Sequence, residues 1–242
     1  MKGDEGLIAV WKREMQSYFF TPVGYVFMGV FLALASVMFY LQIMQQRSSD
    51  LMTFIGQMSY LWMLLSPVLT MRLLAEERQK RTDQLLLTSP VSLTGVVLGK
   101  YLAAVAVMLL TVMCTLAFVG IVAIYGQVYP GEMLVGYLGF VLEGCAFLAM
   151  DLFLSGCAGN QVTAAVMAFG ANFALWIMDM LVDVVGVDWL SRTLDFLSVY
   201  GRNEPFLMGQ LSFASIMYDV SFAAAMLVMT IHRLDSRRWQ GA

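Results

Sequence analysis

Charged residues are scarce in this sequence. Asp, Glu, Lys and Arg make up 13% of the 242 residues, where about 25% is usual for a soluble domain. The formal net charge is only −3, and a protein that binds nucleic acid needs a concentrated basic surface. The scarcity of charge therefore argues against both an ordinary soluble fold and a nucleic-acid partner.

The side chains of most catalytic and metal sites are also scarce. A single histidine, His232, argues against a multi-histidine metal site and a histidine-based catalytic triad. The three cysteines lie inside apolar runs without paired spacing: Cys114, Cys145 and Cys157. They are expected to be buried thiols rather than a disulfide or a metal site.

A phosphate-binding loop is missing as well. The stretch GVVLGKY (residues 95–101) is one residue short of the P-loop spacing, and Tyr101 stands where that loop has the Ser or Thr that binds the metal. The chain is therefore expected to bind no ATP, cofactor or metal by itself and to have no catalytic activity.

Apolar residues, by contrast, are abundant. They make up 60% of the chain, and the mean hydropathy of +0.75 shows that they are spread along it rather than gathered in one anchor. A membrane helix needs about 20 apolar residues. Six stretches are long enough: residues 23–44, 54–74, 95–125, 134–158, 162–184 and 212–232. The expected fold is an all-α polytopic membrane protein with six transmembrane helices in a single domain, residues 1–242.

The positions of Lys and Arg predict the orientation, because basic loops stay in the cytoplasm. They are grouped before span one, between spans two and three, and after span six: Lys2, Lys12, Arg13, Arg72, Arg78, Lys80, Arg81, Lys100, Arg233, Arg237 and Arg238. The opposite side carries only Arg47, Arg192 and Arg202. Both termini are therefore expected in the cytoplasm.

Residues 1–21 are expected to form a helix that lies in the inner membrane interface. Apolar residues recur at helical spacing over residues 7–19, Lys12 and Arg13 occupy another face, and Trp11 is a suitable interfacial anchor. Pro22 disfavours the alternative that this segment merely extends span one.

Residues 72–94 form the most charged segment, and we expect a short cytoplasmic contact helix within it. Thr82 is a suitable N-cap, and Ser89-Pro90 would end the helix. The alternative, a solvated loop, leaves three adjacent leucines unexplained. The candidate contact residues are Glu76, Glu77, Arg78, Arg81, Thr82, Leu85, Leu86 and Leu87.

Residues 185–211, between spans five and six, mix aromatic, aliphatic and charged residues. This composition predicts one or two short helices that rest in or re-enter the outer interface. Gly201 and Pro205 are expected to break the segment into pieces.

Ionisable and amide groups inside the spans are candidate sites, because they are costly in a membrane and usually face protein or water. Glu143 and Asp151 lie in span four. At 100° per residue, four groups of span five fall within roughly 40° of one another: Gln161, Asn172, Asp179 and Asp183. This polar stripe indicates either a transport pathway or hydrogen bonding between helices.

Several motifs resemble those of a known family. MRLLAEERQKRTDQLLLTSPVS (residues 71–92), followed by VLGKY (residues 97–101), resembles the coupling loop of ABC-2-type transporter permeases. WKRE (residues 11–14), TPVGY (residues 21–25) and NQV (residues 160–162) resemble the gliding-motility-associated branch of that family.

The resemblance implies a membrane permease subunit of an ATP-driven exporter in the bacterial inner membrane. In such transporters the loop helix docks on a separate cytoplasmic ABC ATPase, which binds ATP and Mg²⁺. Two ATPase copies and a second membrane subunit, identical or different, complete the complex. The segment at residues 185–211 would cap the pathway on the outside.

Two other readings stay open. One is an ABC complex that transmits force to an extracytoplasmic partner without moving solute, and the other is an ion-coupled carrier that uses the intramembrane carboxylates. The substrate is not named by the sequence, although the apolar walls favour a lipid, a lipid-linked glycan or an amphipathic peptide over a small ion.

Overall fold

The computed structural model describes residues 3–46, 50–81, 92–125, 127–182 and 198–240, and this part of the chain is helical without a strand. The elements are α1 (Gly3–Phe20), α2 (Val23–Leu41), the π-helix η1 (Gln42–Gln46), α3 (Leu51–Gln79), α5 (Leu93–Tyr125), α6 (Pro130–Cys157), α7 (Gln161–Val182), α9 (Val199–Leu207) and α10 (Phe213–Gln240). Six of the helices are long and apolar enough to cross a membrane, which confirms the predicted number of spans.

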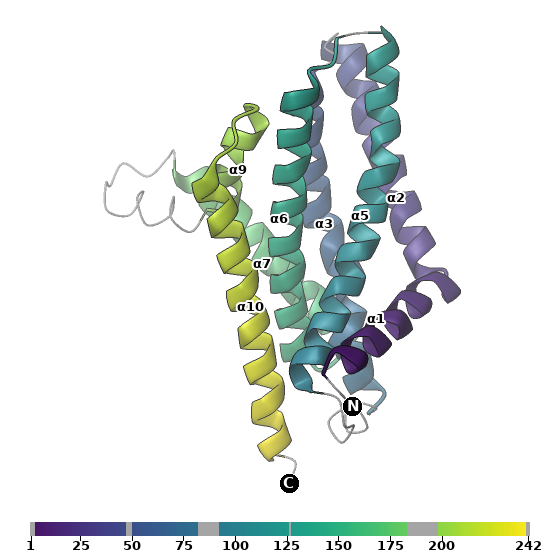
Figure 1. Ribbon diagram of the computed structural model, residues 1–242, viewed down its shortest axis with the longest axis vertical. Helices are drawn as coiled ribbons and strands as arrows, with labels where there is room; N and C mark the ends of the chain where they lie inside the picture. The colour runs from purple at the N-terminus through teal and green to yellow at the C-terminus, as the bar shows by residue number, and fades with distance from the viewer. Residues whose placement is uncertain (1–2, 47–49, 82–91, 126, 183–197, 241–242) are drawn as a thin grey trace.

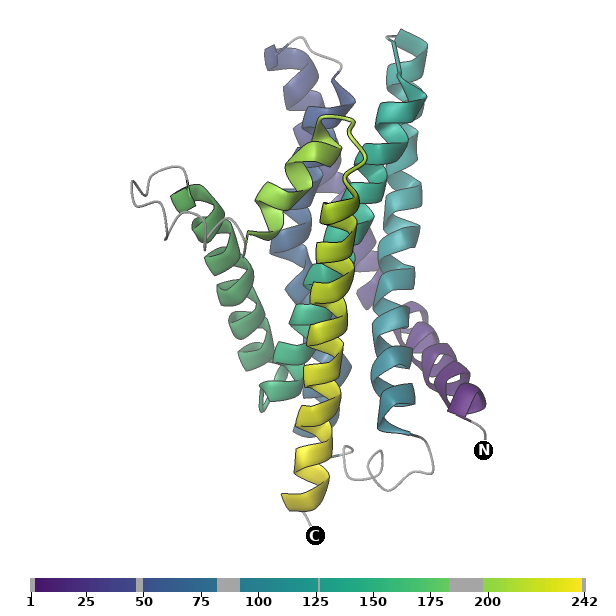
Figure 2. The same ribbon diagram turned by 60° about the vertical axis from the view of Figure 1, so that its left-hand side comes forward.

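The long helices form a bundle whose two chain ends lie at the same end (Figure 1). We call this the terminal end, where α1 begins and α10 finishes, and the opposite one the distal end. Helix α1 is inclined steeply to the bundle at the terminal end, and α9 lies in the distal half (Figure 2). The chain turns between α1 and α2 at Thr21 and Pro22, where the sequence predicts an interruption.

Helices α3 and α6 form the centre of the bundle. In the most apolar 18-residue stretch of each helix, 67% of α3 and 61% of α6 is buried inside the protein, compared with 17% of α7 and 22% of α10. Trp62 of α3 is buried at the middle, with its ring edge-on to Phe27 and Phe31 of α2 and to Phe140 of α6. Edge-on aromatic pairs add to packing, which is the main force between helices once they are in lipid.

Helix α3 is longer than predicted and takes in the first part of the expected loop at residues 72–94. Arg72 and Lys80 both pair with Glu76 at helical i, i+4 spacing, which favours continuation of the helix. The helix ends at Gln79, and Arg81 then has a φ of 55°, the left-handed conformation that often follows a helix C-terminus.

Helix α9 corrects the expectation that Gly201 and Pro205 break the outer segment, because both residues lie inside it. Ser198 caps the helix by accepting a hydrogen bond from the backbone N–H of Gly201 at 2.9 Å. Helix α9 also packs closely against α6, because Gly139 of α6 has no side chain. A Cβ at Gly139 would lie 2.5 Å from Cβ of Phe206 in α9. Packing and capping therefore outweigh the two helix breakers.

The cysteines differ in one respect from expectation. They form no disulfide, but Cys114 lies on the exposed surface of α5, whereas Cys145 and Cys157 are partly buried. In a chain that is apolar on its outside as well as its inside, a position within an apolar run does not by itself indicate burial in the protein.

Candidate functional site

Three helices meet around one buried lysine at the terminal end. Lys100 of α5 is 1% exposed, and its Nζ lies 2.8 Å from Oε1 of Glu14 in α1 and 2.9 Å from Oε1 of Glu77 in α3. A buried ammonium group is stable only when it is paired in this way. We call this cluster, together with Arg72, Glu76 and Lys80, the charged junction.

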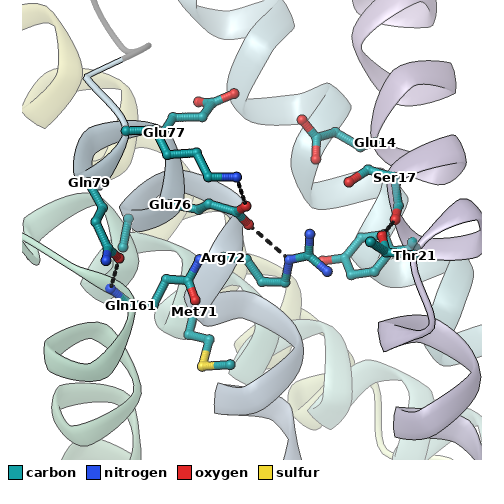
Figure 3. Close-up of polar contacts among 12 residues, drawn as sticks. Glu14, Ser17, Thr21, Met71, Arg72, Glu76, Glu77, Gln79 and Gln161 are labelled. Carbon is teal, nitrogen blue, oxygen red and sulfur yellow. Dashed lines mark hydrogen bonds and ion pairs between the residues drawn. The ribbon is translucent and has the colours of Figure 1, made fainter.

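The second set of ion pairs continues the charged junction along α3. Oε2 of Glu76 accepts from Nε of Arg72 at 3.0 Å, and Oε1 accepts from Nζ of Lys80 at 2.6 Å. Figure 3 shows Arg72 and Glu76 facing the side of α1 that carries Glu14 and Ser17. A pocket of about 240 Å³ lies between these helices, and Arg13 contributes to its wall.

Helix α1 is fastened to the bundle by two further contacts. The hydroxyl of Tyr18 donates a hydrogen bond to the carbonyl of Leu69 at 2.9 Å. Burial, with a smaller contribution from the nearby charge of Glu14, raises the pKa of Tyr18, so that the hydroxyl stays a donor. Gly99 allows α5 to approach α1 closely, because a Cβ at Gly99 would lie 3.0 Å from the side chain of Val10 in α1. The inclined helix is therefore held by hydrogen bonding, packing and charge.

Most of the described candidate contact residues in the loop bind their own chain. Glu76 and Glu77 belong to the charged junction, and the guanidinium of Arg78 donates to the carbonyls of Ala158 at 2.6 Å and Cys157 at 3.3 Å, at the end of α6. Arg81 is exposed. The remaining four lie outside the described residues: Thr82, Leu85, Leu86 and Leu87.

The candidate anchors of α1 are on its surface. Trp11, Lys12 and Arg13 are all exposed, as an interfacial anchor requires. The apolar face is divided, however, because Tyr18 is buried against the bundle while Ile8 is 60% exposed. The sequence could not separate these two uses of an apolar residue.

Glu143 and Asp151 of α6 each meet a serine of α3. Ser59 donates to Oε2 of Glu143 at 2.8 Å, and Ser66 donates to Oδ2 of Asp151 at 2.7 Å. The serines are seven residues apart and the carboxylates eight, so both pairs recur after about two helical turns. Sequence reasoning missed the serines, although this matched spacing was a signal that could have found them.

Asn172 supports a break in the hydrogen bonding of α3. Pro67 has no N–H, so the carbonyl of Met63, four residues earlier, lacks its helical donor. Nδ2 of Asn172 donates to that carbonyl at 3.1 Å. The side chain of Asn172 therefore joins α7 to α3.

The predicted polar stripe of α7 divides into different environments. Oδ1 of Asp179 accepts a hydrogen bond from Ser198, just before α9, and Asp179 lines a distal cavity with Glu143. Gln161 lies at the other end of the helix, where its backbone N–H faces the side chain of Gln79 at 3.5 Å. Asp183 lies outside the described residues.

A family model described as ABC-2 family transporter protein matches residues 27–231. No protein in a search of curated sequences matches the chain. The matched region runs from the second turn of α2 into the last third of α10, and it includes four of the six potential spans completely and most of the first and the sixth. The chain therefore belongs to the ABC-2 transporter family of multi-pass membrane proteins.

Proposed function

We propose that this chain is the permease subunit of an ATP-driven exporter in the bacterial cytoplasmic membrane. It would couple hydrolysis by a separate cytoplasmic ATPase, present in two copies with bound ATP and Mg²⁺, to movement of a substrate. A second membrane subunit, identical or different, would complete the pathway. The family match and the six apolar helices support this proposal, and the motifs at residues 11–14 and 21–25 favour the gliding-motility-associated branch.

The orientation follows from the positions of the basic residues. Lys12 and Arg13 lie in α1, Arg81 follows the end of α3, and Arg233 lies in the last third of α10. Figure 1 shows α1 and the ends of α3 and α10 at the terminal end of the bundle. By the positive-inside rule, this end is proposed to face the cytoplasm. The distal end, with α9, is then extracytoplasmic.

The observation that carries the proposal is the charged junction. Glu77 and Lys100 lie on α3 and α5, the two helices that residues 80–92 connect, and Lys100 is paired both with Glu77 and with Glu14 of α1. A displacement of the loop would therefore move α1, α3 and α5 together, because separating buried opposite charges is costly. This is the property required of a connection that transmits force.

The contacts also divide the candidate coupling residues into two roles. Glu77 and Arg78 would hold the end of α3 to the bundle, since Glu77 pairs with Lys100 of α5 and Arg78 donates to the end of α6. Glu76 would support the last turns of α3 itself, through its pairs with Arg72 and Lys80. Arg81, Thr82 and the three leucines would contact the ATPase, with Leu86 at the middle of the apolar surface.

The test compares three forms of the tagged chain, purified in detergent from its native membrane: wild type, Leu86→Asp and Leu86→Met. Wild type and Leu86→Met should retain an ABC ATPase and ATPase activity, and Leu86→Asp should lose both while its level in the membrane is unchanged. The methionine variant controls for substitution at this position, because it keeps an apolar side chain of similar volume. Recovery of all three forms without an ATPase would refute the proposal.

A further inference from the structure

A cavity of about 370 Å³ lies in the distal half of the bundle, between α3, α6, α7 and α9. Figures 1 and 2 show α9 beside α6 at this level. Its polar side chains are Ser59, Tyr60, Glu143, Asp179, Tyr200, Asn203 and Glu204. Three of these seven are carboxylic acids, and the described residues that line the cavity include no Lys or Arg. The cavity therefore favours a ligand of positive charge.

Among the described residues, three buried polar atoms of the cavity wall have no hydrogen-bond partner: Oε1 of Glu143, Oδ1 of Asn203 and the hydroxyl of Tyr200. Glu143 is 2% exposed, and its Oε1 has no hydrogen-bond partner within the described ranges. The same holds for Oδ1 of Asn203, which is 4% exposed. The other oxygen of Glu143 accepts from Ser59 and from Asn203, so the carboxylate is held in place. An unpaired buried acceptor is costly, and a ligand that donates hydrogen bonds would remove that cost.

The other two acids provide an entrance. Asp179 is partly exposed and Glu204 is exposed, so both can attract a cation from outside the protein. Asp179 is held from one side by the hydroxyl of Ser198. Gly201 leaves the space next to it open, because a Cβ at this position would lie 3.1 Å from Oδ1 of Asp179.

Two aromatic rings in the wall indicate an organic cation rather than a metal ion. The rings of Tyr60 and Tyr200 line the cavity and are stacked with centroids 5.7 Å apart, and Trp176, outside the lining, lies edge-on to Tyr60 at 6.5 Å. Aromatic rings attract ammonium groups. A metal such as Ca²⁺ needs six or more oxygen ligands within about 2.6 Å, and no group of three or more acids, His or Cys in the described part of the chain is placed to hold a metal.

We propose that this cavity binds an ammonium group, presented either by the headgroup of an aminophospholipid or by a small free amine. The ammonium would donate to Glu143 and Asn203 in the interior, while Asp179 and Glu204 attract it at the entrance. The proposal goes beyond the exporter function and does not rest on it, because it concerns binding by this chain alone.

The test is a titration of the purified full chain in nanodiscs of phosphatidylcholine and phosphatidylglycerol. Ethanolamine hydrochloride should raise the apparent Tm in a saturable way, and NaCl or MgCl₂ at equal ionic strength should not. Glu143→Gln should raise the half-saturating concentration by roughly tenfold or more, since it replaces a charged acceptor with a neutral one. Glu143→Gln keeps an oxygen that can accept from Ser59.

Asp151→Asn is the matched control. Asp151 is also a buried acid of α6, but it binds Ser66 and does not belong to the cavity, so this variant should respond to ethanolamine like wild type. If Glu143→Gln does not fold, Asp179→Asn, on the partly exposed side, should show the same loss. An equal Tm response in wild type and Asp179→Asn, no response to ethanolamine, or an equal response to NaCl or MgCl₂ would overturn the proposal.

Nanodiscs that contain phosphatidylethanolamine distinguish the two sources of the ammonium group. A lipid ligand should occupy the cavity in advance, so that ethanolamine no longer changes the Tm and native mass spectrometry detects phosphatidylethanolamine retained by wild type but lost from Glu143→Gln. An unchanged response to ethanolamine in these nanodiscs would support the same site with a free amine as its ligand.

Discussion

At the terminal end of α3, three helices meet around Lys100, and in its distal half four helices surround Glu143. Both groups are almost fully buried. Lys100 lies between two carboxylates, whereas one oxygen of Glu143 has no donor among the described residues. A buried charge with a full set of partners joins the elements that supply them, while an incompletely paired one is free to bind something else. The first arrangement suits force transmission and the second suits recognition.

The two regions share one helix. Ser59 and Glu77 both belong to α3, roughly 27 Å apart along the helix axis. A movement of α3 that starts at the charged junction would therefore also change the wall of the cavity. If the pairing of Lys100 and the open acceptor of Glu143 have the roles inferred above, substitutions in the two regions should differ in their effects on stability and on binding.

The largest effect is expected for Lys100→Met. This change removes the buried cation that pairs with both Glu14 and Glu77, whose side chains are only 14% exposed, and it should lower the free energy of unfolding by about 3 kcal/mol. Thermal or denaturant unfolding of the purified chain in detergent would measure the loss. Lys80→Ala is the control at the charged junction, because the Lys80 side chain is 65% exposed and its ion pair should contribute at most about 1 kcal/mol.

The effect of Glu143→Gln on the free energy of unfolding is the corresponding measurement in the cavity. It replaces a buried acid that has no cation among its described partners, and the amide keeps the acceptor for Ser59, so stability should change far less than in Lys100→Met. Equal losses for the two variants would mean that the two regions do not differ in how their charges are paired.

A smaller effect is expected where α9 closes the cavity. Gly139→Ala would place a methyl group against Phe206, and the resulting overpacking should destabilise the protein by about 2 kcal/mol and change the response to ethanolamine. Gly170→Ala in α7 is the matched control, because nothing lies within 4 Å of a Cβ there. That variant should retain full stability or gain up to about 1 kcal/mol from helix propensity.

The smallest effect is expected for Tyr18→Phe, which removes the hydrogen bond from α1 to Leu69 and should cost about 1 kcal/mol. The folded protein holds the Tyr18 pKa above its ordinary value. The contribution should therefore be complete below about pH 10, the unfolded value, and fall as pH rises beyond it. Unfolding measured at pH 7 and at pH 11 should show a larger difference between wild type and variant at pH 7. A difference that grows with pH would contradict this assignment.

The spans were predictable because a membrane helix must be apolar over a nearly fixed length. The predicted first span, residues 23–44, coincides with the potential span Val23–Met44. At the end of the second span the prediction stopped at residue 74, since charged residues begin there. The helix continues to Gln79 because those charges pair along it, and hydropathy does not measure such pairing.

Candidate residues were harder to predict than spans. Glu143 and Asp179 were recognised because an acid in an apolar run is conspicuous. Of the two residues that hold Glu143, Ser59 was indicated only by its spacing from Ser66, and Asn203 is a common residue with no signal of its own. Lys100 was counted with the basic residues of a cytoplasmic loop, and the structure instead buries it between α1 and α3. Its partner Glu14 is 86 residues away in the sequence.

The sequence by itself determined the class of the protein, the number of its spans and the location of its charges, because these depend on composition and on length along one helix. The tertiary structure alone decided which charges are paired and which are left open. Pairing depends on contacts between distant helices, such as Lys100 with Glu14 and Glu143 with Asn203. No periodicity within one segment encodes such a contact, because its free energy comes from burial and geometry that exist only after the helices pack.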